Sequence, residues 1–246
     1  MLSKTFAKYI QSLHHKKHRD EENSFIAEGE KVVLELLLSG TINCTAVLAT
    51  SEWLNKNEKI LEKYSIGELL EIKDFELEKI SALSTPNQVL GVFKKTATDT
   101  IIVNDQLSIM LDGIQDPGNM GTILRTADWF GIKNIICSLQ CADIYNPKVV
   151  QSTMGSIARV NVLYTDLTAW IAGHDQLKIY AAVLNGKNIK EIKKLKEGVI
   201  LIGNESKGIS TELLQLVNEK ITIEKYGGAE SLNAAVATGI ILSHIT

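Results

Sequence analysis

Residues 198–208 read Gly198-Val199-Ile200-Leu201-Ile202-Gly203-Asn204-Glu205-Ser206-Lys207-Gly208. Four consecutive apolar residues between two glycines predict a strand over 198–203. Because these apolar residues do not alternate with polar ones, we expect both faces of the strand to be covered. The polar residues that follow predict a loop at its carboxyl end, where ligands collect in α/β sheets. A plain strand-to-helix turn is the alternative.

Strands and helices alternate on both sides of this stretch. The predicted strands cover residues 107–112, 134–137, 178–184, 198–203 and 221–223. The predicted helices cover residues 119–130, 147–157, 210–218 and 231–244. Alternation of helices with buried strands predicts a parallel sheet in an α/β domain.

The first part of the chain is also mixed. Helical periodicity covers residues 6–15 and 31–38, and short apolar strands are predicted over 44–49 and 89–93. The stretch over 94–105 is polar and has no helical stripe, which is typical of a linker. We therefore predict a smaller α/β domain over 1–95, a linker over 96–106 and a second domain over 107–246.

Composition places the chain among globular proteins. It has 246 residues, of which 45% are apolar and 22% are charged. Neither a membrane-spanning run nor a secretory signal is visible, so no membrane partner is expected. Cys44, Cys137 and Cys141 are too few for a disulfide framework and fit a reducing cytosol, so we predict a cytoplasmic protein.

The net charge of −3 excludes a polycation, so any nucleic acid must bind to local patches. The first nineteen residues hold five Lys or Arg residues, three His residues and no acidic residue. We predict that Lys16, Lys17 and Arg19 contact a nucleic acid. A solvated helix end is the alternative.

The segment Asp116-Pro117-Gly118-Asn119 combines a turn signal with Asn119, a good helix N-cap residue. The helix that follows carries one apolar stripe, and Gly131 is expected to end it. Arg125 lies off the stripe, and the chain has only three arginines. An exposed ion pair between Arg125 and Asp128 is the plain alternative to a functional role.

A third polar segment, over residues 226–233, precedes an Ala-rich helix. Two glycines predict a loop, and Ser231 can cap the helix. The small residues after it allow close packing, and a close-packed core helix is the simplest interpretation. That interpretation does not explain why Ser231 and Asn233 stand together at its start.

Several common motifs are absent from the sequence. There is no G-x-G-x-x-G after a strand, no G-x-S-x-G and no H-E-x-x-H or C-x-x-C. Cys137 and Cys141 have no nearby His, so no metal is expected.

Taken together, three segments resemble the SpoU/TrmH family of RNA ribose 2′-O-methyltransferases, in the SPOUT superfamily. The family motifs are N-x-G-x-x-x-R-x-A with a following aromatic residue, a strand ending in Gly-Asn-Glu, and E-S-L-N-x-A-V-A. The matching residues are Asn119, Gly121, Arg125, Ala127 and Phe130, then Gly203, Asn204, Glu205 and Gly208, then Glu230, Ser231, Leu232, Asn233, Ala235, Val236 and Ala237. The resemblance covers residues 107–246, and residues 12–19 and 25–29 are similar to the family's substrate-binding domain.

The resemblance implies a fold and a cofactor. The fold is a trefoil-knotted SPOUT methyltransferase domain, which general topology rules would reject. The cofactor is S-adenosyl-L-methionine, expected to bind backbone groups of Gly203, Ile223 and Leu232. Family members act as homodimers, in which the partner completes each site.

The resemblance also implies methyl transfer to a ribose 2′-hydroxyl of structured RNA, either rRNA or tRNA. The family assigns activation of that hydroxyl to Arg125. Because a guanidinium normally stays protonated, Arg125 either accepts a proton in a dry pocket or only orients the hydroxyl and phosphate. The side chains expected to hold Arg125, the cofactor and the ribose are those of Asn119, Glu205, Ser231 and Asn233.

One position departs from the family pattern. The third motif usually opens with a Pro where this chain has Glu224, so we expect a less rigid cofactor loop. Two other functions stay open: a catalytically inactive RNA-binding protein on the same scaffold, and an α/β enzyme acting on a small molecule.

Overall fold

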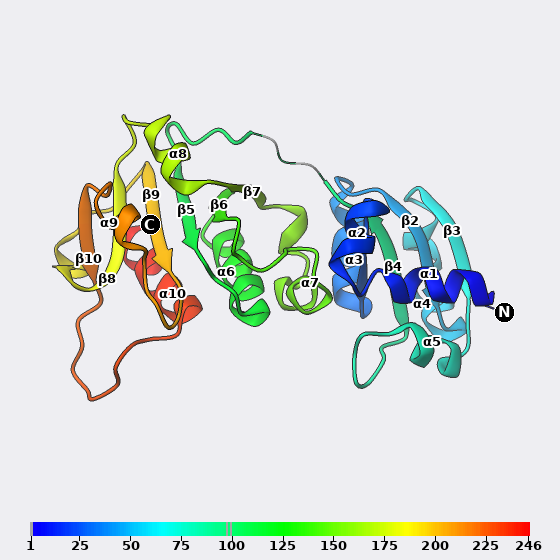
Figure 1. Cartoon of the computed structure of the whole chain (residues 1–246). Coiled ribbons are helices and arrows are strands. Elements are labelled where there is room, and N and C mark those ends of the chain that lie inside the picture. The colour runs from blue at the N-terminus through cyan, green and yellow to red at the C-terminus, as the bar shows by residue number, and fades with distance from the viewer. Residues whose placement is uncertain (1, 97, 99) are drawn as a thin grey trace. The chain divides into compact units, whose positions relative to one another are not determined.

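The computed structural model describes residues 2–96, 98 and 100–246. Packing divides the chain into two compact units (Figure 1). The first comprises Met1–Ala97 and Asp143–Ala158, and the second comprises Thr98–Ala142 and Arg159–Thr246. The predicted linker over 96–106 includes residues 97 and 99, which lie outside the described residues.

The first unit contains a four-stranded sheet and short helices. Its strands are β1 (Ser24–Glu28), β2 (Cys44–Ala49), β3 (Ile66–Glu71) and β4 (Val89–Lys94). Its helices are α1 (Lys4–Ser12), α2 (Lys16–Glu21), α3 (Glu30–Ser39), α4 (Ser51–Leu61), α5 (Asp74–Ile80), α7 (Pro147–Thr153) and the 3₁₀ turn η1 (Ser156–Ala158). The strand order is β1-β4-β2-β3, in which β2 and β3 are parallel and the other two pairs are antiparallel.

Apolar residues of α1 and α5 pack with one another and with β1, β2 and β4. Ile10 and Ile80 are fully buried in this cluster, together with Leu48 and Leu90 of the sheet. The smaller α/β domain that the sequence predicts is therefore present.

Residues 143–158 differ from the predicted division of the chain. The sequence places them in the second domain, whereas they pack with the first unit. Val149 and Val150 of α7 are buried, and α7 contacts β1. The buried Arg19 explains part of this packing, because its Nη2 lies 2.7 Å from Oδ2 of Asp143.

The second unit is built on a six-stranded sheet in which every pair is parallel. Its strands are β5 (Leu107–Asp112), β6 (Asn134–Ser138), β7 (Asn161–Thr165), β8 (Ile179–Asn188), β9 (Gly198–Gly203) and β10 (Glu219–Thr222). Its helices are α6 (Pro117–Trp129), α8 (Leu167–Ala172), α9 (Thr211–Leu214), α10 (Ala234–Ile245) and the 3₁₀ turn η2 (Ile189–Glu191). The strand order is β10-β8-β9-β5-β6-β7.

The parallel sheet confirms the predicted α/β class. The predicted strands over 107–112 and 198–203 match β5 and β9, which are adjacent and buried almost throughout. Two predicted helices are too long. The helix predicted over 147–157 ends at Thr153, because Met154 takes a left-handed φ of 50°. The helix predicted over 210–218 is reduced to the single turn α9.

Helix α6 ends as the sequence predicts. Gly131 has a φ of 73°, its N–H donates to Asp128 O, and Ile132 N–H donates to Ala127 O at 2.8 Å. This pair of bonds is a Schellman motif, which satisfies the last carbonyls of the helix. Across the described residues, none of the helices has the length and apolar character needed to cross a membrane.

Candidate active site

The start of α6 is fixed by Asp116 and Pro117. Asp116 is the N-cap, since its Oδ1 accepts the Asn119 N–H at 2.8 Å, and Pro117 occupies the first turn. The interpretation of Asn119 as the cap is therefore wrong. Because Asp116 does this work, the Asn119 side chain is free to bind elsewhere.

Asn119 joins the three sequence motifs. Its Nδ2 donates to Oε1 of Glu205 at 2.7 Å, and its Oδ1 accepts a hydrogen bond from Nδ2 of Asn233 at 2.8 Å. Asn119 and Glu205 are half-buried, and Asn233 is exposed. These side chains come from the start of α6, the loop after β9 and the start of α10. The fold thus brings together three of the predicted site residues.

Asn233 is also the N-cap of α10. Its Oδ1 accepts the backbone N–H groups of Ala235 at 2.9 Å and Val236 at 3.2 Å. The expectation that Ser231 caps this helix is wrong, because the helix begins after Asn233. Asn233 thus uses both its Oδ1 and its Nδ2, and it joins Asn119 to the start of α10. These bonds hold the side-chain amide of Asn233 in one orientation.

The loop after β9 is closed by Asn204. Its Oδ1 accepts the N–H groups of Ser206 and Lys207, and its Nδ2 donates to Gly113 O at 2.7 Å. At Gly203, a Cβ would lie 2.3 Å from the carbonyl carbon of Gly208. The loop therefore needs glycine at Gly203, where its own backbone folds back. No role is predicted for Asn204 from the sequence, although its place after a buried strand is a usable signal.

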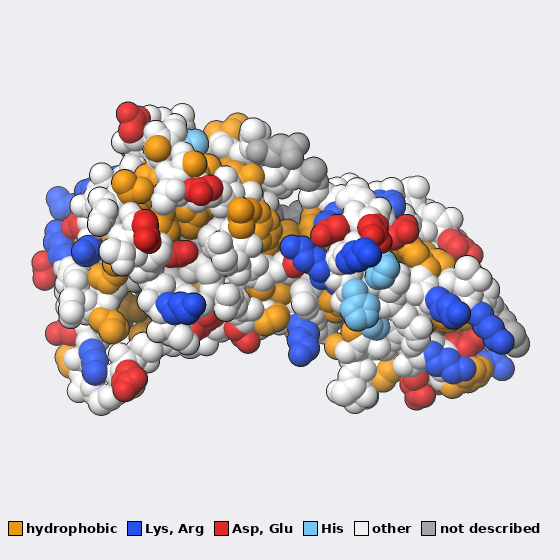
Figure 2. Space-filling model, in the orientation of Figure 1, with side chains coloured by type: hydrophobic (Ala, Val, Ile, Leu, Met, Phe, Trp, Pro, Cys, Tyr) orange, Lys and Arg blue, Asp and Glu red, His pale blue; other side chains and the backbone are white. Residues whose placement is uncertain are grey.

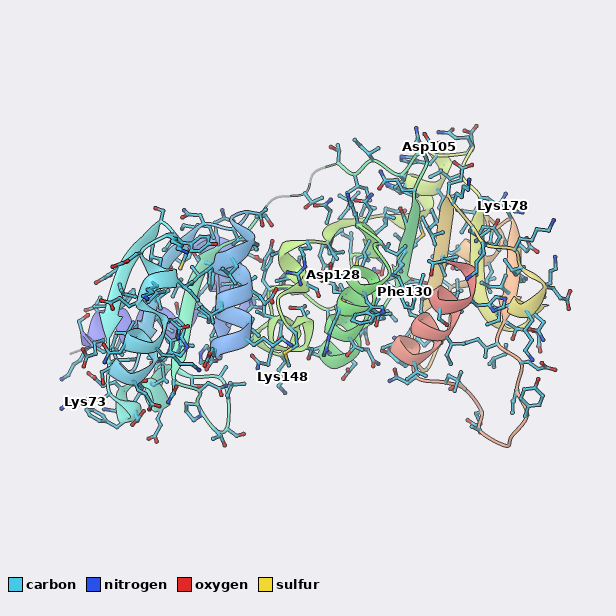
Figure 3. All side chains as sticks on the ribbon, turned by 180° about the vertical axis from the view of Figure 1, so that it is seen from behind. Lys73, Asp105, Asp128, Phe130, Lys148 and Lys178 are labelled. Atoms are coloured by element: carbon cyan, nitrogen blue, oxygen red, sulfur yellow. The ribbon has the colours of Figure 1, made fainter. Side chains whose placement is uncertain are left out.

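Arg125 is exposed on α6, and among the described residues it forms no hydrogen bond or ion pair. The alternative of an ion pair with Asp128 is not found. Asp128, labelled on α6 in Figure 3, binds Nε of Arg159 at 2.9 Å instead. The guanidinium of Arg125 is thus available to a ligand. Asn119, Glu205 and Asn233 form what we call the Asn119 cluster. Within the described part of the chain, no hydrogen bond joins Arg125 or Ser231 to it.

The three residues expected at the cofactor lie at strand ends or just before α10. Gly203 ends β9, Ile223 follows β10, and Leu232 is 47% exposed. Within the described residues, residues 224–232 form no backbone-to-backbone hydrogen bond. Their N–H and C=O groups are free, which fits a ligand bound through the backbone.

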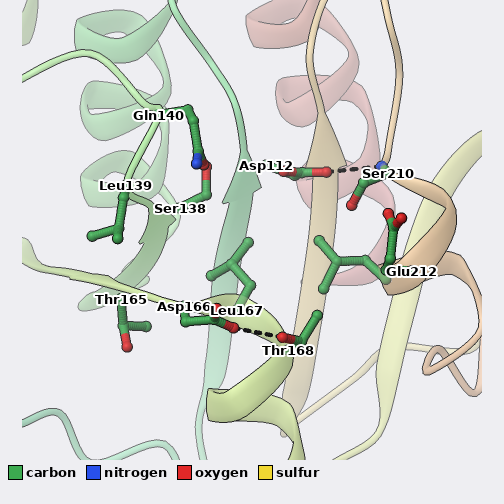
Figure 4. A pocket seen from close by; sticks show the side chains of 11 residues that line it. Asp112, Ser138, Leu139, Gln140, Thr165, Asp166, Leu167, Thr168, Ser210 and Glu212 are labelled. Carbon is green, nitrogen blue, oxygen red and sulfur yellow. Dashed lines mark hydrogen bonds between the residues drawn. The ribbon is translucent and has the colours of Figure 1, made fainter.

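A separate cavity of about 200 Å³ lies at the carboxyl ends of β5, β6 and β7 (Figure 4). None of the predicted site residues lines it. Two of its carboxylates serve the fold, since Asp112 accepts the Ser210 N–H at 2.8 Å and Asp166 caps α8. Figure 4 shows α8 in front of the sheet and α6 and α10 behind it, so the cavity and the Asn119 cluster involve different helices.

The basic N-terminal segment divides into exposed and buried residues. Lys16 and Lys17 are exposed on α2, and Figure 2 shows basic and histidine side chains gathered over α1 and α2. Arg19 is only 2% exposed. Its guanidinium binds Asp143 and the carbonyls of Leu13 and His14. The prediction that Arg19 contacts RNA is therefore corrected: Arg19 is a structural residue.

These features define an α/β protein with a parallel sheet and a polar cluster at the carboxyl ends of its strands, preceded by a smaller domain. Residues 106–243 match the SpoU rRNA Methylase family, and residues 4–91 match the MRM3-like substrate binding domain. The chain belongs to the SpoU rRNA methylase family, as the sequence motifs predict.

Individual relatives are similar to this chain along almost its whole length. A 23S rRNA (guanosine(2553)-2′-O)-methyltransferase of Bacillus subtilis is 31% identical, over 96% of this chain and 93% of its own length. A TrmH-family structure from Porphyromonas gingivalis has a TM-score of 0.89 and 35% identity, and covers 99% of this chain and 98% of its own. An AdoMet-bound rRNA methyltransferase from Sinorhizobium meliloti has a TM-score of 0.88 and 30% identity, and covers 100% and 96%.

Proposed function

We propose that this chain transfers a methyl group from S-adenosyl-L-methionine to a ribose 2′-hydroxyl of ribosomal RNA. The observation that carries the proposal is the Asn119–Glu205–Asn233 cluster, which joins all three sequence motifs. Full-length similarity to a named 23S rRNA 2′-O-methyltransferase supports RNA as the substrate, with rRNA favoured over tRNA. An AdoMet-bound relative supports the cofactor.

When bound, the cofactor supplies a reactive methyl group, so the protein mainly has to position the ribose. The free guanidinium of Arg125 has the fork geometry that holds a phosphate and a hydroxyl together. Asn119 and Asn233 fix the loops on either side of the site, and Glu205 accepts from Asn119. We assign Ser231 to the ribose or cofactor, because its hydroxyl lies in the exposed loop before α10.

We also propose a homodimer. Helices α6 and α10 pack together, and their outer surface carries Trp129, Val236 and Ile240, which are 85%, 50% and 37% exposed. Exposed apolar side chains on neighbouring helices are typical of an interface. Among the small residues of α10, Ala234 and Ala235 do not supply this surface, since they are buried in their own unit. Sedimentation of a 27.1 kDa species with full activity would contradict the dimer.

The trefoil knot and the cytoplasmic location belong to the same proposal. Membership of the SpoU family supports the knot. The location is supported by Cys44, Cys137 and Cys141, which are all free thiols.

Binding of labelled S-adenosyl-L-methionine separates this proposal from a catalytically inactive RNA-binding protein. We expect saturable binding to the purified chain in the absence of RNA. An absence of binding, with RNA affinity retained, would favour the inactive protein. Turnover of a small molecule without RNA would favour an α/β enzyme that acts on small molecules.

A further inference from the structure

The loop that joins β10 to α10 is held at both ends and free between them. At its far end, Asn233 binds Asn119. In its middle, an added Cβ at Gly227 or Gly228 would meet no atom within 4 Å, so the chain is open there. At its start, Glu224 and Tyr226 both bind Lys190. The start of the loop is therefore restrained by side chains of this chain alone.

The parallel pairing of β8 and β10 explains how these groups meet. Thr222 pairs with Asn188, so continuing the same register places Glu224 opposite Lys190. Lys190 Nζ lies 2.8 Å from Oε2 of Glu224, 2.8 Å from the Tyr226 hydroxyl and 5.4 Å from the Tyr226 ring centroid. Asn188 Nδ2 donates to the same Glu224 oxygen at 3.2 Å, and the Tyr226 hydroxyl donates to it as well.

The hydrogen bonds among Lys190, Glu224, Tyr226 and Asn188 form a cluster that we call the Lys190 anchor. The turn that carries Lys190 is itself packed against the fold. Lys190 lies in η2, which packs against α10, and Ile189 is 5% exposed. Asn188 Oδ1 also accepts the Lys190 N–H at 3.0 Å. Hydrogen bonds from Lys190, Tyr226 and Asn188 lower the pKa of the Glu224 carboxyl to about 2. The carboxylate is therefore charged at every pH at which the protein is expected to work.

We propose that Lys190 is a positioning residue for cofactor binding: it holds Glu224 and Tyr226, and so keeps the backbone of the loop in the conformation that binds the cofactor. This inference rests on the proposed function. If the loop adopts this conformation for only a fraction of the time, its apparent Kd for the cofactor rises in inverse proportion to that fraction. A loop that is held in the conformation avoids this loss of affinity. The chain has Glu224 where the family usually has Pro, and side-chain contacts restrain the backbone at this point.

The Lys225–Tyr226 peptide bond reports on the restraint without any cofactor, because trypsin cleaves after lysine in mobile loops. We expect Lys190→Met to raise the rate of cleavage at this bond about fivefold, and Lys190→Arg to restore it to within about twofold. The matched control is Lys178→Met. Lys178, labelled in Figure 3, also contacts a carboxylate and a tyrosine ring, Glu219 and Tyr180, at the other end of the same strand pair. Unchanged cleavage in Lys190→Met would overturn the proposal.

Affinity for S-adenosyl-L-methionine, measured by calorimetry, tests whether the restraint on the loop strengthens cofactor binding. We expect Lys190→Met to raise Kd about fivefold, together with KM for the cofactor, while kcat at saturation stays within about twofold. Lys190→Arg and Lys178→Met should keep the wild-type Kd. Faster cleavage with an unchanged Kd, or a fall in kcat alone, would overturn the positioning role. If the wild-type protein bound no cofactor, the proposed function would fail, and the cleavage experiment would still decide whether the anchor exists.

Discussion

The side-chain amide of Asn233 donates to Oδ1 of Asn119 at 2.8 Å, across 114 positions of sequence. Asn233→Asp separates this bond from the capping role of the same residue. Aspartate caps a helix as well as asparagine does, so stability should change by less than about 1 kcal/mol. It cannot donate, however, and Asn119 would present its carbonyl oxygen to a carboxylate. We expect kcat to fall about tenfold or more, which corresponds to a loss of about 1.4 kcal/mol of transition-state stabilisation once Asn119 is misplaced.

The control for Asn233→Asp is the same substitution at another helix N-cap. Asn146 caps α7 through its Oδ1, which accepts the Lys148 N–H at 2.9 Å. Asn146→Asp should leave both kcat and the unfolding midpoint close to wild type. Full activity in Asn233→Asp would show that the amide bridge does not serve catalysis.

Arg125→Ala should abolish methyl transfer while the fold and cofactor affinity persist. The side chain is exposed and has no partner among the described residues, so its removal opens no cavity. We expect the free energy of unfolding to change by well under about 2 kcal/mol, since exposed substitutions usually stay within about 0.5 kcal/mol. Urea unfolding and cofactor titration of the variant provide the measurement. A larger loss of stability would place Arg125 among structural residues.

Lys16 and Lys17 should supply RNA affinity without taking part in the chemistry. Each phosphate contact removed flattens the slope of log K against log salt by about 0.7–0.9. The Lys16→Ala, Lys17→Ala double variant should therefore lose about 1.5 units of slope and keep its kcat at saturating RNA. Lys59 and Lys63, which are exposed elsewhere on the same unit, are the control pair. A collapse of kcat at an unchanged salt slope would mean that the segment acts at the active site.

Arg19→Ala should behave differently from its neighbours. Removing the guanidinium leaves Asp143 without its ion pair and two carbonyls without a donor. Breaking a buried pair in this way costs about 3 kcal/mol, whereas Lys17→Ala should cost less than about 0.5 kcal/mol. Chemical unfolding of the two variants gives the comparison. Equal stabilities would contradict the structural role of Arg19.

The sequence predicts buried strands best. The runs that become β5 and β9 are continuous and apolar, and turn residues bound them, so their ends could be placed correctly. Edge strand β3 carries polar residues on an exposed surface and gives no such signal. Helix starts depend on single hydrogen bonds. The Asp116–Pro117 pair is a readable N-cap signal, but Asn119 competes with it in the sequence.

The candidate site could be predicted only in part. Spacing alone does not bring Asn119, Glu205 and Asn233 together, since 86 positions separate Asn119 from Glu205 and 114 separate it from Asn233. Only the family resemblance grouped them. The buried state of Arg19 depends on Asp143, 124 positions away, which no local pattern shows. The Lys190 anchor depends on the register of β10 against β8, which includes an irregularity between Lys220 and Ile221.

The chemical nature of the methylated product tests ribose 2′-O-methylation by this chain. The purified protein is incubated with unmodified ribosomal RNA and cofactor carrying a labelled methyl group, and the RNA is then hydrolysed in alkali. A 2′-O-methyl group removes the hydroxyl that alkaline cleavage requires, so label should appear in alkali-resistant dinucleotides and vanish with Arg125→Ala. Label in ordinary mononucleotides would indicate base methylation, and no label with active cofactor binding would indicate an inactive protein. Either result would contradict ribose 2′-O-methylation by this chain.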